Sequence, residues 1–205
     1  MKQSGLSILG GTTLFQSVGQ GSKPMKPHKY VVECNFSDIR HLFEKYHYKG
    51  GHMDGGISFC LALIENGDII GGAVMGKLRH EKAYNALGKT IEIRRMACEE
   101  TAPKNTESYF LSKVVWWVKS NKLADTIVSY ADQTVGHKGT IYRASNFKLM
   151  GETSATIHVF WDGVRYHPRS LSIDRPYSYK LREAVKTGEA KVEKGLPKLI
   201  FIYKI

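Results

Sequence analysis

The stretch TIVSYADQTVGHKGTIYRASNFKLMG, residues 126–151, decides the fold of this chain. It opens with a β-branched run that predicts a buried strand. The strand ends at Asp132, a turn with two glycines follows, and residues 140–145 are typical of a short helix. Asn146 comes next, and Asn tolerates the positive φ that often ends a helix. We therefore expect a strand, a polar turn and a short helix in succession.

Polar side chains gather around the end of this strand. Asp132 closes the strand, His137 lies in the turn and Tyr142 lies on the short helix. In open sheets covered by helices, ligands commonly bind beyond the carboxyl ends of the strands. The sequence therefore predicts a functional site here. The alternative is that Asp132 caps the helix and Tyr142 packs in the core, because Asp is a common helix cap.

Hydrophobic periodicity predicts the other elements of the chain. The expected strands are residues 30–34, 57–65, 69–75, 90–98, 156–161, which Gly151 precedes, and 198–204. One expected helix is capped by Ser37 or Asp38, a second follows the loop 103–108, and a third begins at residue 180. This order fits an α/β (α+β) fold with a mixed central β-sheet and helices on both faces.

Four local patterns refine this outline. Asn66-Gly67 between apolar runs predicts a hairpin. Residues 164–179 are expected to be irregular, and residues 77–89 to form a long polar loop. The lysines at both ends of residues 198–204 suit an edge strand.

Length and cysteine usage limit the class of protein. At 205 residues the chain can bury a sizeable core, and we expect a flexible lead over 1–27 followed by one domain over 28–205. The three cysteines form no Cys-x-x-Cys pair, which favours a reducing compartment. No apolar run is long enough to cross a bilayer. We therefore expect a cytoplasmic protein without a membrane partner.

The charge of the chain favours an anionic partner. The net charge is +11, and residues 165–205 hold ten Lys or Arg against four Asp or Glu, a net of +6. Such a balance is typical of proteins that bind nucleic acid, a membrane surface or a phosphorylated cofactor. The alternative for residues 165–205 is a solvated basic surface.

Two further stretches carry groups that could do chemistry. Residues 46–52, YHYKGGH, hold His and Tyr side chains, which can ligate iron, but two His five residues apart make a weak metal signal, and the alternative is an aromatic helix end packed on the core. The loop 103–108 leads from a strand into a helix, and the free N–H groups of a helix start attract anions such as pyrophosphate. The alternative is that Thr106 or Ser108 only caps this helix.

The motifs of the chain resemble two related families. GTIYRASNFKLMGET resembles the acceptor-side helix of GNAT acyltransferases. YADQTVGHKGTIYRASNF resembles the Mom family, phage proteins that modify adenine in DNA, and the family's HY, EIRR and NTES motifs precede it in the right order. The resemblance covers roughly residues 30–203. The chain lacks the Gly-rich Arg/Gln motif of most GNAT proteins and has KNTES at that place, which leaves the donor open.

The resemblance implies a GNAT-like catalytic domain with a splay between two central strands. Its implied catalytic residues are Asp132 as general base, Tyr142 as its hydrogen-bond partner or a proton donor, and Tyr48. The implied cofactor-binding residues are Arg94, Arg95, Lys104, Asn105 and Ser108. The implied metal ligands are His47 and Tyr48, holding iron. The donor would be an acyl-CoA or an activated glycine.

The resemblance also implies a substrate and a product. The acceptor would be the N6 amine of adenine in double-stranded or locally opened DNA, reached by flipping the base onto an aromatic side chain. The aromatic candidates are Tyr48, Tyr142, Phe147 and Trp161. The family's product is N6-carbamoylmethyl adenine, an isomer of N6-glycyl adenine, so glycyl transfer followed by rearrangement would form it. The resemblance further implies a protein of phage origin that acts in the host cytoplasm and protects phage DNA from restriction. It is compatible with a homodimer.

Two other functions remain open from the sequence. The first is a GNAT N-acetyltransferase that acts on a protein or a small amine. The second is a basic DNA-binding protein on the same scaffold without catalysis, for which the absent Gly-rich motif is the favouring feature.

Overall fold

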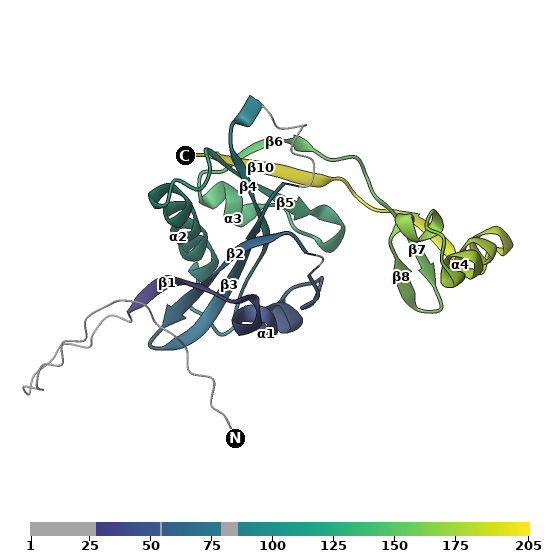
Figure 1. Ribbon diagram of the computed structural model, residues 1–205, viewed down its shortest axis with the longest axis horizontal. Coiled ribbons are helices and arrows are strands. Elements are labelled where there is room, and N and C mark those ends of the chain that lie inside the picture. The colour runs from purple at the N-terminus through teal and green to yellow at the C-terminus, as the bar shows by residue number, and fades with distance from the viewer. Residues whose placement is uncertain (1–27, 54, 79–85) are drawn as a thin grey trace, which may run out of the picture.

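The computed structural model describes residues 28–53, 55–78 and 86–205, which form two β-sheets (Figure 1). The larger sheet has the strand order β1-β2-β3-β4-β5-β10-β6. Its strands are β1 (Lys29–Cys34), β2 (Ile57–Glu65), β3 (Asp68–Gly76), β4 (Thr90–Cys98), β5 (Thr126–Asp132), β6 (Lys148–Glu152) and β10 (Lys198–Lys204). The smaller sheet has the order β8-β7-β9, from β7 (Ile157–Trp161), β8 (Val164–Tyr166) and β9 (Lys191–Lys194). The helices are α1 (Phe36–Tyr46), α2 (Thr106–Ser120), α3 (Thr140–Ala144) and α4 (Pro176–Thr187), with 3-10 turns η2 (Gln133–Val135) and η3 (Pro168–Leu171).

Helices cover both faces of the larger sheet, as the sequence predicted. The α1 side chains Ile39, Leu42 and Phe43 pack on one face against strand residues such as Val74. The α2 side chains pack on the other face, and α3 joins them through Ile141 and Tyr142. Alternate residues of β2 and β3 supply the two faces because side chains alternate along a strand. The fold is therefore a mixed sheet between two helical layers.

The two central strands β4 and β5 separate part of the way along. They are parallel and pair from Thr90↔Thr126 to Ile93↔Ser129. Beyond these residues β4 continues to Cys98 and β5 to Asp132, and these two described segments do not pair with each other. The expected splay between central strands is therefore present, and the end of β5 faces an opening in the sheet.

The last strand lies inside the sheet and not at its edge. β10 pairs with β5 on one side and with β6 on the other, both antiparallel. The expectation of an edge strand was therefore wrong. The lysines that suggested an edge lie only at the two ends of β10, whereas its middle, Leu199 to Phe201, is buried. Lys198 thereby faces Asp132 directly across the β5–β10 pair.

The opening stretch of the sequence folds nearly as predicted. It forms β5, η2 and α3, and Asn146 has the expected positive φ of 63°. Phe147 is buried at 4% exposure. Gly151 lies within β6 rather than ahead of the next strand. Gly139, before α3, has a φ of 73°, and a Cβ there would collide with the ring of Phe201.

The smaller sheet departs most from the sequence prediction. Residues 164–179 were expected to be irregular but contain β8, η3 and the start of α4. The helix begins at Pro176, four residues before the expected start, because Pro suits the first turn of a helix. β9 was missed, since KVEK is short and mostly polar. Val159, Leu181, Ala184 and Ala190 form a separate apolar cluster in this part of the molecule.

Three smaller points complete the comparison with the sequence. Asn35 caps α1 together with Asp38, so neither Ser37 nor Asp38 is the cap residue itself. The predicted lead, 1–27, and most of the predicted loop 77–89 lie outside the described residues. Within the described residues no helix is long and apolar enough to cross a membrane.

Candidate active site

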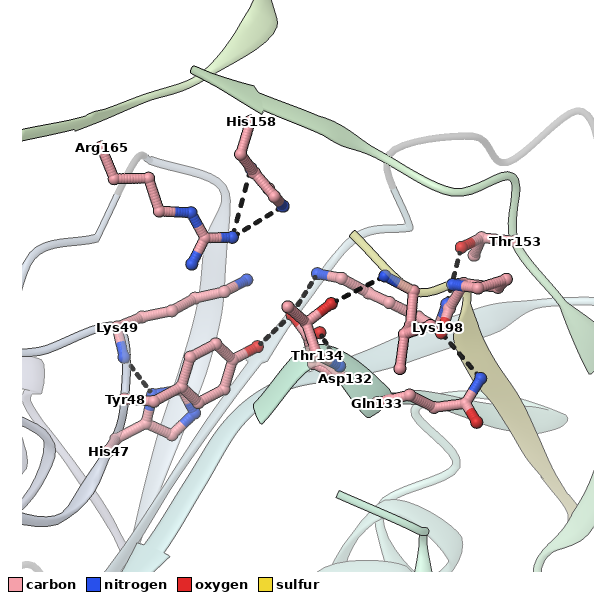
Figure 2. Close-up of polar contacts among 12 residues, drawn as sticks. His47, Tyr48, Lys49, Asp132, Gln133, Thr134, Thr153, His158, Arg165 and Lys198 are labelled. Carbon is pink, nitrogen blue, oxygen red and sulfur yellow. Dashed lines mark hydrogen bonds and ion pairs between the residues drawn. The ribbon is translucent and has the colours of Figure 1, made fainter. Parts of the chain in front are cut away.

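Asp132 and Tyr48 meet at the end of β5, where the central strands separate (Figure 2). Asp132 is only 5% exposed. Its Oδ2 accepts a hydrogen bond from the Tyr48 hydroxyl at 3.2 Å and lies 3.4 Å from Lys198 Nζ. Its Oδ1 accepts from the backbone N–H of Thr134 at 3.1 Å. Both carboxylate oxygens are thus engaged, and the carboxylate is held in one orientation.

The neighbours of Asp132 set the charges of this site. Burial raises the pKa of Asp132, but the charge of Lys198 and the hydrogen bond from Thr134 outweigh it and lower the pKa overall. Burial and the nearby Asp132 raise the pKa of Tyr48. Partial burial and the charge of Lys198 lower the pKa of Lys49 to about 8. Asp132 is therefore ionised near neutral pH, and Tyr48 remains a neutral donor.

Arg94 and Arg95 hold the loop that carries Tyr48. The Arg95 guanidinium donates to the carbonyls of Gly50 and His52, and Arg94 donates to the carbonyl of Gly55. β4 presents the two side chains on alternate sides, and both reach the segment after α1. Sequence reasoning assigned both arginines to cofactor binding. In the structure neither lines the groove at the start of α2, and their visible contacts position the Tyr48 loop.

Replacing Arg95 by Met is expected to loosen this loop. The carbonyls of Gly50 and His52 lose a charged donor, which costs about 1–3 kcal/mol of unfolding free energy. His47 reports the same change, since burial and then the charge of Arg95 lower its pKa to about 4. Removal of that charge raises the His47 pKa toward, but not to, its ordinary value. Urea unfolding and NMR titration of the His47 ring measure the two effects, and an unchanged His47 pKa would contradict this account.

Tyr142 lies in the core beneath the site. Its hydroxyl accepts a hydrogen bond from Ser129 at 2.7 Å, and its ring packs against Phe147 and stacks on Phe201. Burial raises the pKa of Tyr142. No contact joins Tyr142 to Asp132 among the recorded interactions of the described residues, so the structure does not bring these two predicted catalytic residues together.

The aromatic residues expected to stack a flipped base lie in different places. Phe147 is buried and Tyr142 is largely enclosed. Trp161 packs in the smaller sheet against Tyr166. Tyr48 remains, with 41% of its surface exposed.

A groove of about 550 Å³ runs along the start of α2, between the end of β4 and α3. Lys104, Asn105 and Ser108, three of the residues predicted to bind the cofactor, line it. Asn105 is the N-cap residue of α2, and the Thr106 hydroxyl donates to the carbonyl of Pro103 at 2.6 Å, so the alternative role as cap belongs neither to Thr106 nor to Ser108. Three glutamates also line the groove: Glu99, Glu100 and Glu107. The groove thus has mixed charge.

The residues predicted to hold iron do not fit a metal ion in this arrangement. His47 Nδ1 accepts a hydrogen bond from the backbone N–H of Lys49 at 3.2 Å, and the Tyr48 hydroxyl is directed to Asp132. The positive charges of Arg95 and Lys49 act on His47 and would oppose the binding of a metal cation there. In the described part of the chain no three His, Cys, Asp or Glu side chains come together as a metal ion requires.

Sequence reasoning expected the basic stretch 165–205 to face an anionic partner, but it did not single out the basic residues that lie around Tyr48 and Asp132. Lys198 and Lys49 extend toward Asp132, and Arg165 of β8 points toward the same place from the smaller sheet, where it contacts His158 (Figure 2). No local signal marks Lys198, because only the β5–β10 register brings it opposite Asp132. Lys49 stood in the quoted YHYKGGH stretch, and its place beside Tyr48 was the one available signal.

Comparison with known sequences gives one family and one curated relative. The sequence profile described as the Mom protein family matches residues 28–203. Methylcarbamoylase mom of Escherichia phage Mu is 26% identical over 166 residues. That match covers 77% of this chain and 66% of the phage protein, slightly less than two thirds of the relative's length.

Comparison with solved structures identifies the fold as that of GNAT acetyltransferases. An acetyltransferase from Bacillus subtilis, solved in complex with CoA, superposes with a TM-score of 0.52 at 14% identity, over 88% of this chain and 99% of that chain. An N-acetyltransferase from Staphylococcus aureus gives a TM-score of 0.52 at 14% identity, over 86% and 98%. The ribosomal-protein-S18-alanine N-acetyltransferase of Escherichia coli gives 0.51 at 9% identity, over 87% and 94%. At these identities the likeness establishes the fold alone.

Proposed function

Because the chain belongs to the Mom protein family, we propose that it is a transferase that converts adenine in DNA to N6-carbamoylmethyl adenine. The observation that carries this proposal is the hydrogen-bonded pair of Tyr48 and Asp132 at the opening between β4 and β5. The phage relative is named a methylcarbamoylase, which matches this product. The net charge of +11 suits a DNA substrate.

Asp132 is the proposed proton acceptor. The N6 amine of adenine is a weak nucleophile, and its nitrogen becomes strongly acidic once it has attacked an acyl carbon. A carboxylate that is ionised near neutral pH is ready to take that proton. Tyr48 and Lys198 would fix the carboxylate, and the exposed ring of Tyr48 would lie against the flipped base.

The groove at the start of α2 is the proposed donor site. Lys104, Asn105 and Ser108 line it, and the fold's relatives include an acetyltransferase solved with CoA. Its three glutamates oppose a polyanion and would favour a donor that carries a positive charge, such as the amino group of an activated glycine. The two donors to be tested are therefore an acyl-CoA and an activated glycine that is not attached to coenzyme A.

The proposed chemistry has two steps that balance without an oxidant. First, adenine N6 forms a bond to the glycyl carbonyl carbon, the donor's leaving group departs, and the N6 proton passes to Asp132. Second, the glycyl amine attacks C6 of the ring, and the original C6–N6 bond breaks. The attacking amine gives up one proton and the departing nitrogen gains one, so the original N6 ends as the carboxamide nitrogen. The two forms of the base are isomers.

Mass spectrometry of nucleosides from DNA of cells that express the protein tests this function. We expect a deoxyadenosine species heavier by one carbamoylmethyl group, absent from cells without the protein. DNA labelled with ¹⁵N at adenine N6 tests the second step, and we expect the label in the carboxamide. Label retained on the nitrogen attached to the ring would exclude the rearrangement but keep the function. Unmodified DNA in the presence of glycyl donors would contradict the function itself.

The mixed charge of the groove favours one other function, a basic DNA-binding protein without catalysis. Such a protein would shift DNA in a gel yet leave every nucleoside mass unchanged with acyl-CoA and glycyl donors. An ordinary GNAT acetyltransferase would instead turn over acetyl-CoA with polyamines or peptides when DNA is absent. The same purified sample therefore distinguishes the three functions.

A further inference from the structure

Three basic side chains from distant parts of the chain meet beside the Tyr48–Asp132 pair. Lys49 follows α1, Lys198 begins β10, and Arg165 lies on β8 of the smaller sheet. Figure 2 shows the Lys49 and Lys198 side chains directed toward Asp132 and the Arg165 guanidinium directed toward His158, above the Lys49 side chain in this view. The charge of Arg165 acts on Tyr48, and that of Lys198 acts on Lys49, so these groups share one electrostatic environment.

The carboxylate of Asp132 does not neutralise this cluster. Its oxygens are already engaged by Tyr48, Thr134 and Lys198. In the described part of the chain Arg165 contacts the ring of His158, at 2.7 Å from Nε2, and no carboxylate. Burial and the charge of Arg165 lower the pKa of His158, so that ring remains neutral. One negative charge therefore faces two lysines and an arginine.

The positively charged side chains of this cluster repel one another, and an anion bound between them would relieve that repulsion. Lys49 and Lys198 lie close enough for the charge of one to lower the pKa of the other. Guanidinium and ammonium groups that converge from separate elements are the usual means of holding a phosphate. Arg165 and Lys49 both remain in contact with solvent, so a ligand can reach them without unfolding the site.

We propose that Lys49, Lys198 and Arg165 form a phosphate-binding site, and that its ligand is a backbone phosphate of the DNA strand that carries the acceptor base. This assignment rests on the proposed function and names how the acceptor is held. The donor has its own groove at the start of α2, and none of the three basic residues lines that groove. The site at Tyr48 therefore receives the acceptor between the larger sheet and the smaller one, where Arg165 closes over the phosphate.

The test is the salt dependence of binding to a short single-stranded oligodeoxynucleotide that contains adenine, measured by fluorescence anisotropy without any donor. The variants are Lys49→Met and Arg165→Met, which keep the length of the side chain and remove its charge. Each lost phosphate contact should flatten the slope of log K against log salt concentration by about 0.7. Lys119→Met is the matched control, since Lys119 is an exposed lysine on α2, away from the smaller sheet (Figure 1). Thermal unfolding of each variant confirms that it is folded.

The outcomes separate this proposal from its rivals. A loss of slope in both site variants, with the Lys119 variant unchanged, is the expected result. The proposal would be overturned if the slopes of the Lys49 and Arg165 variants equalled the slope of the Lys119 variant. A second arm adds coenzyme A. If coenzyme A displaces the oligonucleotide and the two site variants weaken coenzyme A binding, the phosphate belongs to the donor and the assignment to DNA is wrong. The binding result stands whether or not the nucleoside masses change, so failure here and failure of the proposed function are distinguishable.

Discussion

Replacing Asp132 by Asn is expected to lower the rate of adenine modification by a factor of about 10²–10⁴, the usual contribution of a positioned general base. Asn has the shape of Asp, and its single oxygen can still accept from the backbone N–H of Thr134, while its amide N–H can donate to the Tyr48 hydroxyl in place of the bond that Tyr48 now donates, so the backbone around the site should keep its geometry. It cannot accept the proton that leaves N6. Because the pKa of Asp132 lies below its ordinary value, the carboxylate is ionised throughout the neutral range, and the loss should not depend on pH there. Single-turnover mass spectrometry of a modified oligonucleotide measures it.

Tyr48→Phe is the matched control for this experiment. It removes the hydrogen bond to Asp132 but leaves the carboxylate and the aromatic ring. We expect a smaller loss than for Asp132→Asn. Equal activity of Asp132→Asn and the unchanged protein would remove Asp132 from the catalytic residues and leave it as a partner of Lys198. Oligonucleotide binding by the variant shows whether any loss lies in binding or in chemistry.

Replacing Gly139 by Ala is expected to lower the free energy of unfolding by about 2–5 kcal/mol. A left-handed backbone conformation costs a residue with a Cβ about 1–2 kcal/mol, and overpacking a core costs about 1–3 kcal/mol more. Both apply here, since Gly139 has a φ of 73° and its added Cβ would meet the ring of Phe201. Urea unfolding measures the change. Tyr142 stacks on the same ring, so its environment should change as well.

Gly136→Ala separates the two causes. Gly136 also has a positive φ, 80°, but no atom lies within 4 Å of an added Cβ. We expect only the backbone cost of about 1–2 kcal/mol for this variant. Phe201→Leu combined with Gly139→Ala should recover part of the loss, because a smaller side chain makes room. Equal destabilisation by the two Ala variants would mean that the Phe201 ring moves aside freely.

Local sequence patterns predicted much of the fold. The β2–β3 hairpin follows from Asn66-Gly67, and the β5–α3 unit follows from its β-branched run and its glycines. The position of β10 could not be predicted in the same way. Its pairing with β5 joins residues far apart in the sequence, and nothing in KLIFIYK distinguishes a central strand from an edge strand. The smaller sheet escaped notice because β8 and β9 are too short to show a period.

The sequence predicted the acidic and aromatic residues of the candidate site. It did not predict which basic residues lie beside them. Asp132 and Tyr48 were named from motifs, and the structure brings them together. The resemblance to the Mom pattern placed Arg95 with the cofactor, whereas its hydrogen bonds in the structure go to the Tyr48 loop, a direction that the sequence around a buried guanidinium does not give. Lys198 and Arg165 stand in the basic stretch 165–205, which the sequence assigns as a whole to an anionic partner without distinguishing one residue from another. Their role depends on three-dimensional neighbours alone.

The interior position of β10 determines when the site can form during synthesis. Tyr48 and Asp132 are 84 residues apart, and Lys198 is supplied by the strand that also completes the pairing of β5. Contacts between distant parts of a chain form late, because long loops must close before such contacts stabilise anything. A growing chain that stops short of β10 has β5 unpaired on one side and Asp132 without its lysine. The ribosome must therefore release nearly all of the described sequence before any copy can carry an assembled site.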